Sequence, residues 1–344
     1  MSPSFTPPAT GREWHLVARP HGRPRPDDFA LREVPVPAVG PGQVLIRNHF
    51  FSVDPYMRGR MGDTNSYVYF PPMALGEAMG GAAVGEVIAC ADPALAVGDL
   101  VLHFGGWREY AVLPATEATR VDTPGIPLSA HLGVLGMTGL SAYAGLFEVA
   151  DFRPGDAVFV SGAAGAVGSQ VGQMARLAGA SRVIGSAGTP EKVKYLVEEL
   201  GFDAAFNYKD GPVLEQLRAA APHGIDVYFD TVGGDHLEAA IDVLHEHGRV
   251  TLCGAIAQYN DVEPPPGPRN LPVAIGKRLH LHGMLVLDHE KLRPRFTTEV
   301  AGWIAAGELT WRETVVDGIE HGVDAFLGLF RGDNTGKMIV ALRP

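Results

Sequence analysis

The stretch Ser161–Gly168, "SGAAGAVG", has the spacing of a turn that binds a phosphate group. An apolar run that ends at Val160 precedes it, and a predicted helix follows it. Compared with G-x-G-x-x-G, the pattern has Ala163, Gly165 and Gly168, with Gly162 beside the replaced first glycine. A strand, a glycine turn and a helix in this order present N–H groups and a partial positive charge to a pyrophosphate. The stretch therefore predicts a dinucleotide-binding turn.

The end of the next predicted strand, Gly185–Gly188, distinguishes the two nicotinamide cofactors. NAD sites usually place Asp or Glu there, about 20 residues after the turn, on the ribose 2′-hydroxyl. This place reads "GSAG", and Lys192 stands just beyond it in the first turn of a predicted helix. A carboxylate would repel a 2′-phosphate, whereas a lysine pairs with it. The sequence predicts NADPH rather than NADH. The alternative for Lys192 is a solvated charge beside Glu191.

Two tyrosines are candidates for polarising a substrate carbonyl group. Tyr259, in "CGAIAQYN", follows a predicted strand at its carboxyl end, where open α/β sheets bind ligands. Tyr56, in "SVDPYMRGRM", follows Pro55 and is predicted to lie on a loop. The alternative for each is a packed aromatic ring with a hydrated hydroxyl.

Other kinds of catalytic site find little support in the sequence. The only cysteines, Cys90 and Cys253, form no C-x-x-C pair, and the histidines of "HLHG" and "HEH" have no evident third ligand. There is no H-E-x-x-H and no G-x-S-x-G. We therefore expect no metal site, and hydride transfer from a nicotinamide fits best.

The elements that would position these residues fall into two groups. Up to about residue 125, short β-like runs alternate with Pro- and Gly-rich turns, which is typical of a barrel-like β domain. From about residue 128, strands alternate with helices, one of them over 235–248, which predicts a doubly wound parallel sheet. The tail returns to β-like runs. We expect a β domain over 1–127 and 306–344 and a nucleotide domain over 128–305.

Composition narrows the range of partners and locations. The 344 residues carry a formal charge of −11, which argues against nucleic acid or an anionic membrane as the main partner. The stretch 126–147 is the longest without a charged residue, but it contains Pro127, His131 and several glycines, so we expect a buried helix rather than a membrane span. The first residues lack the pattern of a signal peptide, and we expect a cytoplasmic protein.

Several stretches resemble the medium-chain dehydrogenase/reductase superfamily. They resemble most its zinc-independent branch, which contains leukotriene/prostaglandin reductases, plant alkenal double-bond reductases and bacterial curcumin reductase. The matching stretches run in order along nearly the whole chain: "SVDPYMRGRM", "GAAVGEV", "LGVLGMTGLSAYAGL", "VSGAAGAVGSQVGQMA", "GSAGTPEKV", "GFDAAFNYK", "IDVYFDTVGG", "CGAIAQYN" and "DNTGKMIV". The resemblance implies an α/β fold, with a GroES-like β-barrel domain and a Rossmann domain whose doubly wound sheet is parallel. The Cys and the "GHE" of the zinc-dependent relatives are missing here.

The resemblance also implies which residues contact NADPH. The family pattern places four residues at the pyrophosphate, Lys192 and Tyr208 at the adenosine end, two stretches along the nicotinamide half, and Asn334 on the returning tail. The four residues at the pyrophosphate are Gly165, Ala166, Val167 and Gly168. The first stretch along the nicotinamide half runs from Cys253, Gly254, Ala255 and Ile256 to Tyr259. The second stretch is Met284, Leu285 and Val286. Four positions depart from the pattern: Thr138 for Pro, Ser141 for Thr, Thr231 for Asn and Met284 for Phe. The cofactor contact of position 231 and the shape of the substrate pocket are therefore left open.

The implied reaction is NADPH-dependent reduction of the C=C bond of an α,β-unsaturated ketone or aldehyde. Hydride goes to the β-carbon, Tyr259 donates a hydrogen bond to the carbonyl oxygen, and Tyr56 forms a pocket wall or a second donor. The alternatives are an NADPH quinone oxidoreductase on the same fold and a non-catalytic NADPH-binding protein. Relatives are often dimers, so a homodimer is left open. The sequence specifies neither the enone nor the proton donor to the α-carbon.

Overall fold

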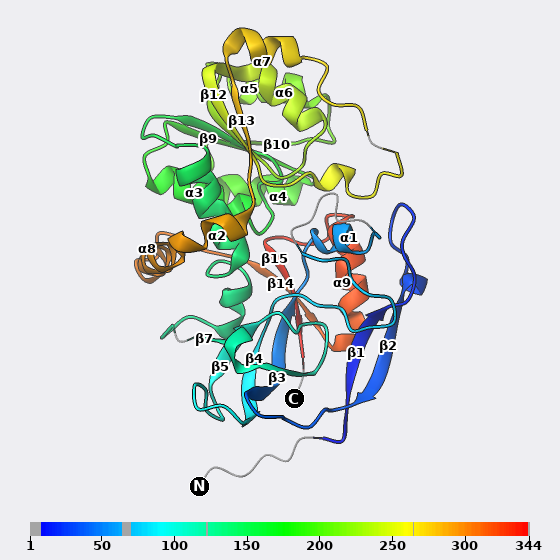
Figure 1. The fold of residues 1–344 in the computed structure, drawn as a ribbon. Helices are drawn as coiled ribbons and strands as arrows, with labels where there is room; N and C mark the ends of the chain where they lie inside the picture. The colour runs from blue at the N-terminus through cyan, green and yellow to red at the C-terminus, as the bar shows by residue number, and fades with distance from the viewer. Residues whose placement is uncertain (1–7, 64–69, 122, 264, 343–344) are drawn as a thin grey trace. The chain divides into compact units, whose positions relative to one another are not determined.

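The chain forms two compact units, which we describe separately. The computed structural model describes residues 8–63, 70–121, 123–263 and 265–342. The first unit contains the described residues up to Leu132, together with Thr314–Asp333 and those from Met338 onward. The second unit contains Gly133–Glu313 and Asn334–Lys337. The second unit is thus inserted between segments of the first (Figure 1).

The first unit is built on antiparallel strands. A hairpin pairs β1 (Thr10–Leu16) with β2 (Phe29–Pro35). A seven-stranded sheet has the order β14-β15-β3-β4-β5-β7, with β6 paired to β3. Its strands are β3 (Gln43–Ser52), β4 (Ala83–Cys90), β5 (Leu100–His103), β6 (Tyr110–Pro114), β7 (Thr119–Arg120), β14 (Glu313–Asp317) and β15 (Lys337–Ala341). This sheet and the short helices α1 (Met57–Arg60) and α9 (Gly322–Leu329) form a GroES-like domain.

Aromatic side chains fill the core of the first unit. The ring of Trp107 lies 5.1 Å from that of Phe51 and 6.1 Å from that of Phe326, and all three residues are fully buried. The indole N–H of Trp107 donates to the carbonyl of Ser52 at 3.2 Å, so the buried ring leaves no unsatisfied donor. This packing joins α9 to β3, although they are far apart in sequence.

The second unit is a Rossmann domain. Its six strands are all parallel and lie in the order β10-β9-β8-β11-β12-β13. From β8 the chain adds strands first toward β10 and then, from β11 onward, on the other side of β8. The strands are β8 (Ala157–Val160), β9 (Arg182–Ala187), β10 (Ala204–Asn207), β11 (Ile225–Asp230), β12 (Leu244–Leu252) and β13 (His280–Gly283). All four residues of β8 are buried, as expected for a central strand covered on both faces. The predicted α/β fold with a parallel doubly wound sheet is confirmed.

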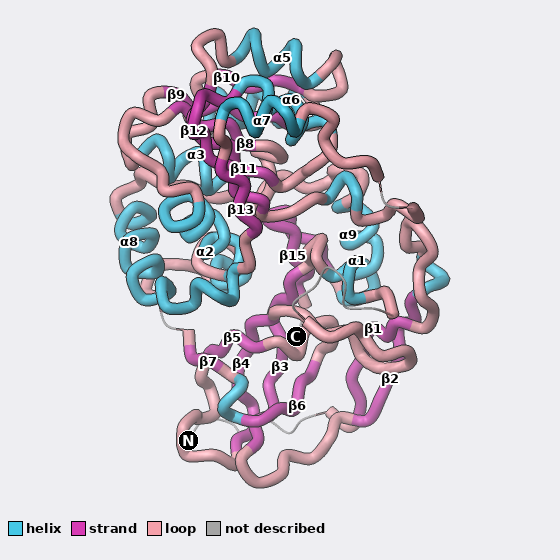
Figure 2. The backbone as a smooth tube through the Cα atoms, turned by 45° about the horizontal axis from the view of Figure 1, so that its top comes forward, coloured by secondary structure: helices cyan, strands magenta, loops and turns pink. Residues whose placement is uncertain are grey.

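Helices cover both faces of this sheet. Helices α5 (Val213–Ala220), α6 (Asp235–Val243) and α7 (Leu271–Lys277) lie together on one face, and α2 (Met137–Ala144), α3 (Gly168–Leu177) and α8 (Arg293–Ala305) lie together on the other (Figure 2). Helix α4 (Pro190–Lys194) connects β9 to β10. The strand order reverses between β8 and β11, and sheets of this kind bind ligands outside the carboxyl ends of the strands at such a point.

Two predicted helices differ in the structure. The helix predicted over 235–248 ends at Val243, and β12 begins at Leu244. Leu244 is drawn into the sheet by pairing with Ile225 of β11, so tertiary pairing overrides the local helical pattern. The stretch 126–147 is not one helix either: it contains a 3₁₀ segment (Leu128–Leu132), then α2, then a π-helical turn that begins at Gly145.

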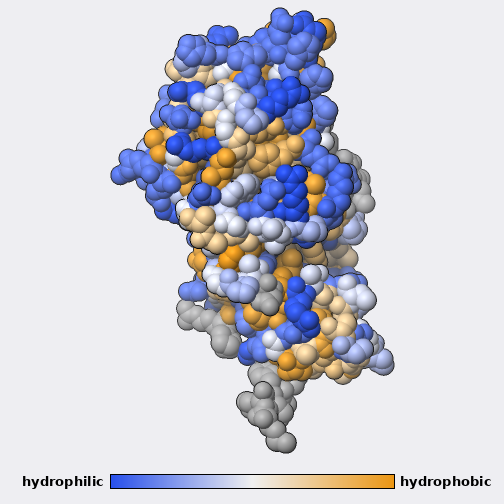
Figure 3. Space-filling model, turned by 90° about the vertical axis from the view of Figure 1, so that its left-hand side faces the viewer, coloured by the Kyte–Doolittle hydropathy of each residue, from blue (hydrophilic) through white to orange (hydrophobic). Residues whose placement is uncertain are grey.

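No helix among the described residues is long and apolar enough to cross a bilayer. On the face shown in Figure 3, hydrophobic patches lie between hydrophilic side chains. Among the described residues, the most exposed large hydrophobic side chain is Ile275 on α7, at 77%.

Candidate functional site

The glycine turn joins β8 to α3 in a geometry that excludes larger residues at two positions. A Cβ on Gly168 would lie 2.7 Å from the Cα of Ala163, and Gly162 has a φ of +56°. At Gly165 a Cβ would meet only the carbonyl oxygen of Gly162, at 3.2 Å. Glycine is thus required for packing at Gly168, whereas at Gly165 it keeps the outer side of the turn open. This is the division expected of a dinucleotide-binding turn.

One N–H group in this turn is placed to receive an anion. Ala166 and Val167 are partly exposed and precede α3 directly. Ala166 follows a parallel bridge between Gly165 and Gly336, whereas within the described part of the chain the N–H of Val167 donates to no protein acceptor. A free donor at the start of a helix suits a pyrophosphate, so the turn fits NADPH.

The returning tail also reaches this turn. The N–H of Gly336 donates to the carbonyl of Ala164 at 2.8 Å, and the side-chain amide of Asn334 donates to the carbonyl of Gly336 at 2.8 Å. Asn334 therefore lies beside the glycine turn although 160 or more residues separate them in the chain. Its role toward the cofactor stays a prediction.

A second group of predicted residues meets where β9 and β10 end. Thr189 caps α4, and its hydroxyl accepts a hydrogen bond from the N–H of Lys192 at 3.3 Å, which places Lys192 in the first turn as expected. Tyr208 follows β10, and a Cβ on Gly188 would lie 3.1 Å from its ring. The ammonium of Lys209 lies 5.7 Å from the centre of the same ring. Lys209 was not predicted, although its place directly after Tyr208 was a visible signal.

A buried carboxylate ties two loops together at the carboxyl edge of the sheet. Oδ1 of Asp230, the last residue of β11, accepts hydrogen bonds from the hydroxyls of Ser161 at 3.0 Å and Tyr228 at 2.7 Å. It also accepts from the N–H groups of Val232 at 2.9 Å and Gly233 at 2.8 Å. Burial raises the pKa of Asp230 above its usual value, and these hydrogen bonds offset part of that rise. The sequence analysis missed Asp230, although a carboxylate at the end of a central strand was a signal for it.

Thr231, one of the four residues that depart from the family pattern, takes part in the same hydrogen-bond network. The hydroxyl of Thr231 donates to the carbonyl of Ser161 at 2.9 Å, and its N–H donates to the hydroxyl of Ser161 at 2.9 Å. Thr231 thus binds the first residue of the glycine turn. Two further departures, Thr138 and Ser141, lie in α2. The hydroxyl of Thr138 donates a hydrogen bond to the carbonyl of Gly133, and that of Ser141 donates to the carbonyl of Met137.

The loop that carries Tyr259 lies on this network. The N–H groups of Cys253 and Gly254 donate to the carbonyl of Asp230 at 2.9 and 3.1 Å, and that of Ile256 donates to the carbonyl of Thr231 at 3.2 Å. The hydroxyl of Tyr259 accepts a hydrogen bond from the N–H of Ala255 at 3.3 Å. Burial, with Cys253 and Asp230 nearby, raises the pKa of Tyr259 despite that bond. Tyr259 therefore keeps its proton at neutral pH.

The remaining nicotinamide-half residues follow the neighbouring strand. The N–H of Met284 donates to the carbonyl of Leu252 at 3.0 Å, which sets Met284 beside the start of the Tyr259 loop. Val286, two residues on, is buried. A Cβ on Gly145 would lie 2.9 Å from the sulfur of Met284, so this side chain packs closely against the backbone after α2.

Tyr56 belongs to the first unit. It lies in the turn that immediately precedes α1, which agrees with the predicted loop. Its ring lies 5.5 Å from that of Phe70, and Phe70 lies 5.4 Å from Phe104. Burial lowers the pKa of Arg60, and the nearby Tyr56 raises it by less.

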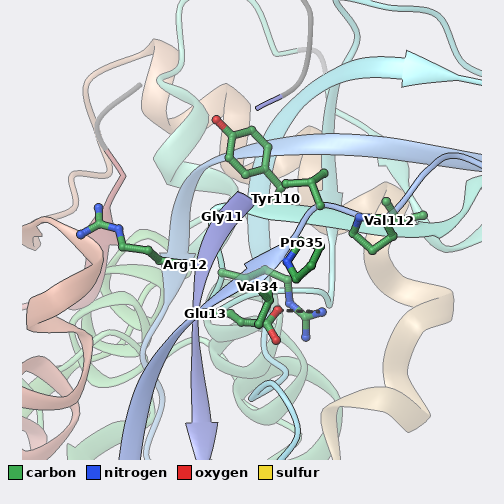
Figure 4. Close-up of a pocket in the computed structure, with 10 residues that line it drawn as sticks. Gly11, Arg12, Glu13, Val34, Pro35, Tyr110 and Val112 are labelled. Atoms are coloured by element: carbon green, nitrogen blue, oxygen red, sulfur yellow. Dashed lines mark ion pairs between the residues drawn. The ribbon is translucent and has the colours of Figure 1, made fainter. Parts of the chain in front are cut away.

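One hollow in the first unit contains none of the predicted site residues. It has a volume of about 290 Å³ and lies among β1, β2 and β6, with Arg12, Glu13, Val34 and Tyr110 in its lining (Figure 4). The carboxylate of Glu13 lies 3.9 Å from the guanidinium of Arg108. Within the described ranges, no three His, Cys, Asp or Glu side chains are arranged to hold a metal ion.

Comparisons with known proteins agree with this fold. The family profile "N-terminal domain of oxidoreductase" matches residues 12–121, and "Zinc-binding dehydrogenase" matches residues 166–302. The chain is 39% identical to the NADPH-dependent curcumin reductase of Escherichia coli, with 96% of each chain covered. It belongs to the medium-chain dehydrogenase/reductase family.

Within the medium-chain dehydrogenase/reductase family, two further relatives locate the branch. The 2-alkenal reductase (NADP⁺-dependent) of Nicotiana tabacum is 40% identical, over 93% of this chain and 94% of that protein. The crystal structure of CurA from Vibrio vulnificus in complex with NADPH superposes with a TM-score of 0.91 at 37% identity, over 97% of this chain and 99% of CurA. The chain therefore lies in the branch of prostaglandin, alkenal and curcumin reductases.

Proposed function

We propose that this chain uses NADPH to reduce the C=C bond of α,β-unsaturated ketones or aldehydes. The observation that carries the proposal is the similarity, over more than nine-tenths of each chain, to a curcumin reductase and a 2-alkenal reductase. The chain is accordingly an NADPH-dependent oxidoreductase. The free N–H group of Val167 supports the same cofactor, because it suits an anion.

The cofactor would be held by residues of the second unit. We assign the pyrophosphate to the turn Gly165–Gly168, the adenosine end to Lys192 and Tyr208, and the nicotinamide half to residues 253–259 and 284–286, with Asn334 on the tail. When bound, NADPH supplies a hydride. We also retain the assignment of substrate binding to residues 1–127 and 306–344 and of NADPH binding to 128–305.

The protein's own contribution to the chemistry would come mainly from Tyr259. Its hydroxyl is protonated at neutral pH, because burial raises its pKa. In the bond with Ala255 the oxygen accepts, so its proton is not used there. We propose that through this proton the hydroxyl donates a hydrogen bond to the carbonyl oxygen of the substrate, where negative charge accumulates. A donor of this kind typically contributes ~2.7–4 kcal/mol to transition-state stabilisation.

The rival functions lead to different substrates. The test measures NADPH oxidation with alkenals, alkenones and quinones, with NADH as the comparison cofactor. Turnover with enones and NADPH supports the proposal, whereas turnover with quinones alone supports a quinone oxidoreductase. Binding of NADPH without turnover on any compound would support a non-catalytic role. We also propose a homodimer, which light scattering of the purified protein would test.

A further inference from the structure

The side chain of Asp230 joins the glycine turn to the segment that follows β11. Asp230 is the last residue of β11, and only 1% of its surface is exposed. Its Oδ1 accepts a hydrogen bond from the hydroxyl of Ser161, at the start of the turn, and another from the N–H of Gly233, after the strand. Hydrogen bonds are directional, and those to a carboxylate are among the stronger ones. One buried oxygen therefore fixes the turn and the segment after β11 relative to each other.

Thr231 makes a second connection between the same two segments. Its hydroxyl donates to the carbonyl of Ser161 and its N–H donates to the hydroxyl of Ser161, both at 2.9 Å. A Cβ on Gly162 would lie 2.6 Å from the hydroxyl of Thr231, so the turn and this side chain are in close contact. The hydroxyl of Ser161 thus donates to one residue at the end of β11 and accepts from the next.

The loop that carries Tyr259 is bonded to the backbone of this segment. The N–H of Gly254 donates to the carbonyl of Asp230 at 3.1 Å, and that of Ala257 donates to the carbonyl of Val232 at 3.2 Å. A Cβ on Gly254 would lie 3.2 Å from the hydroxyl of Tyr259, so the phenol lies against the bonded part of the loop. A shift of the segment after β11 would therefore displace this hydroxyl as well.

We propose that Asp230 is a positioning residue, which sets the hydroxyl of Tyr259 at its working distance from a cofactor held by the glycine turn. The inference rests on the proposed function, because it takes NADPH at the turn and Tyr259 as the donor to the substrate. A misplacement of about 1 Å can lower a rate by about 10²-fold. A change at Asp230 should lower kcat more than the affinity for NADPH, because the free N–H of Val167 lies further along the turn.

The test is a double-mutant cycle on kcat with an enone. Asp230→Asn keeps an acceptor oxygen but loses the charge, so it should lower kcat by about tenfold and change the Kd for NADPH by less than about threefold. In Tyr259→Phe, which has no hydroxyl to misplace, the same change should lower kcat by less than about twofold. The control is Asp226→Asn, near the other end of β11, where the carboxylate binds the N–H of Ala157 and the ring of His245. This control should have the kcat of the wild type.

Ser161→Ala removes the hydroxyl on the other side of the connection, and it carries the cycle if Asp230→Asn is too unstable to assay. It should lower kcat about three- to tenfold in the wild type and less than about twofold in Tyr259→Phe. An equal fall in both backgrounds would overturn the inference, because a general loss of structure does not depend on the hydroxyl of Tyr259. Unchanged kcat in the single variants would overturn it too. These outcomes leave the proposed function intact, whereas a wild type that reduces no enone would refute that function and the inference with it.

Discussion

The hydroxyl of Tyr259 and the N–H of Ala255 are hydrogen-bonded at 3.3 Å within one loop, with the hydroxyl as acceptor. This bond orients the phenol without consuming its proton. The loop is itself fastened to the carbonyl groups of Asp230 and Thr231. The position of the proposed donor is therefore set by backbone bonds rather than by flexible side chains.

Replacing Tyr259 by Phe should lower kcat on an enone by about 10²–10³-fold, the usual effect of losing one donor to a developing oxyanion. The dissociation constant for NADPH should change by less than about twofold, because the ring remains. Steady-state kinetics and fluorescence titration measure the two quantities. The control Tyr110→Phe, in the first unit, should leave both unchanged. Unaltered turnover of Tyr259→Phe on every enone would refute the role.

The two glycines of the turn should respond differently to alanine. Gly168→Ala places a Cβ 2.7 Å from backbone atoms, so it should destabilise the protein by about 1–3 kcal/mol, as overpacking does. Gly165→Ala meets only one oxygen, at 3.2 Å, so it should cost little stability. Its methyl group would occupy the open side of the turn and weaken NADPH binding. Urea unfolding and NADPH titration of both variants test this, and equal stability losses would contradict it.

Removing the carboxylate of Asp230 should destabilise the second unit. Asp230→Ala leaves the buried hydroxyls of Ser161 and Tyr228 without this acceptor, together with two N–H groups. We expect a loss of at least about 3 kcal/mol in the free energy of unfolding. Asp230→Asn keeps an oxygen acceptor and should cost clearly less. Equal unfolding midpoints for wild type and Asp230→Ala would show that the network is not important for stability.

A buried histidine in the first unit, His103, should make the protein less stable as the pH falls. The N–H of Gly105 donates to Nδ1 of His103, so Nε2 carries the proton and donates to Asn48 at 2.8 Å. Burial lowers the pKa of His103 to about 3, from 6.5. As the pH falls below 6.5, His103 becomes protonated in the unfolded chain but stays neutral in the folded protein. Protonation therefore stabilises the unfolded chain, and the free energy of unfolding falls.

Between pH 7 and pH 5 this group should remove about 2 kcal/mol from the free energy of unfolding. The measurement is urea unfolding at both pH values. The glutamine of His103→Gln does not titrate. Between pH 7 and pH 5 the free energy of unfolding of this variant should therefore fall by about 2 kcal/mol less than that of the wild type. Equal pH dependence in the two proteins would rule out the assignment.

How far the sequence predicts this molecule depends on the range of the interactions. The strand–turn–helix around Gly165 and the helix start before Lys192 were predicted correctly, because each depends on neighbouring residues. The end of α6 at Val243 was not, because Leu244 joins β12 through pairing with a distant strand. Thr231 could be recognised as a departure, but not its bond to Ser161.

The central claim, hydride transfer to the C=C bond, is tested most directly by isotope transfer. The protein is incubated with an α,β-unsaturated ketone and NADPH that carries deuterium at C4 in the transferred position, with each C4 epimer tried in turn. The product is analysed by NMR and mass spectrometry. The account predicts a saturated ketone with deuterium on the β-carbon. Deuterium on the carbonyl carbon of an allylic alcohol, or no deuterated product with either epimer, would contradict it.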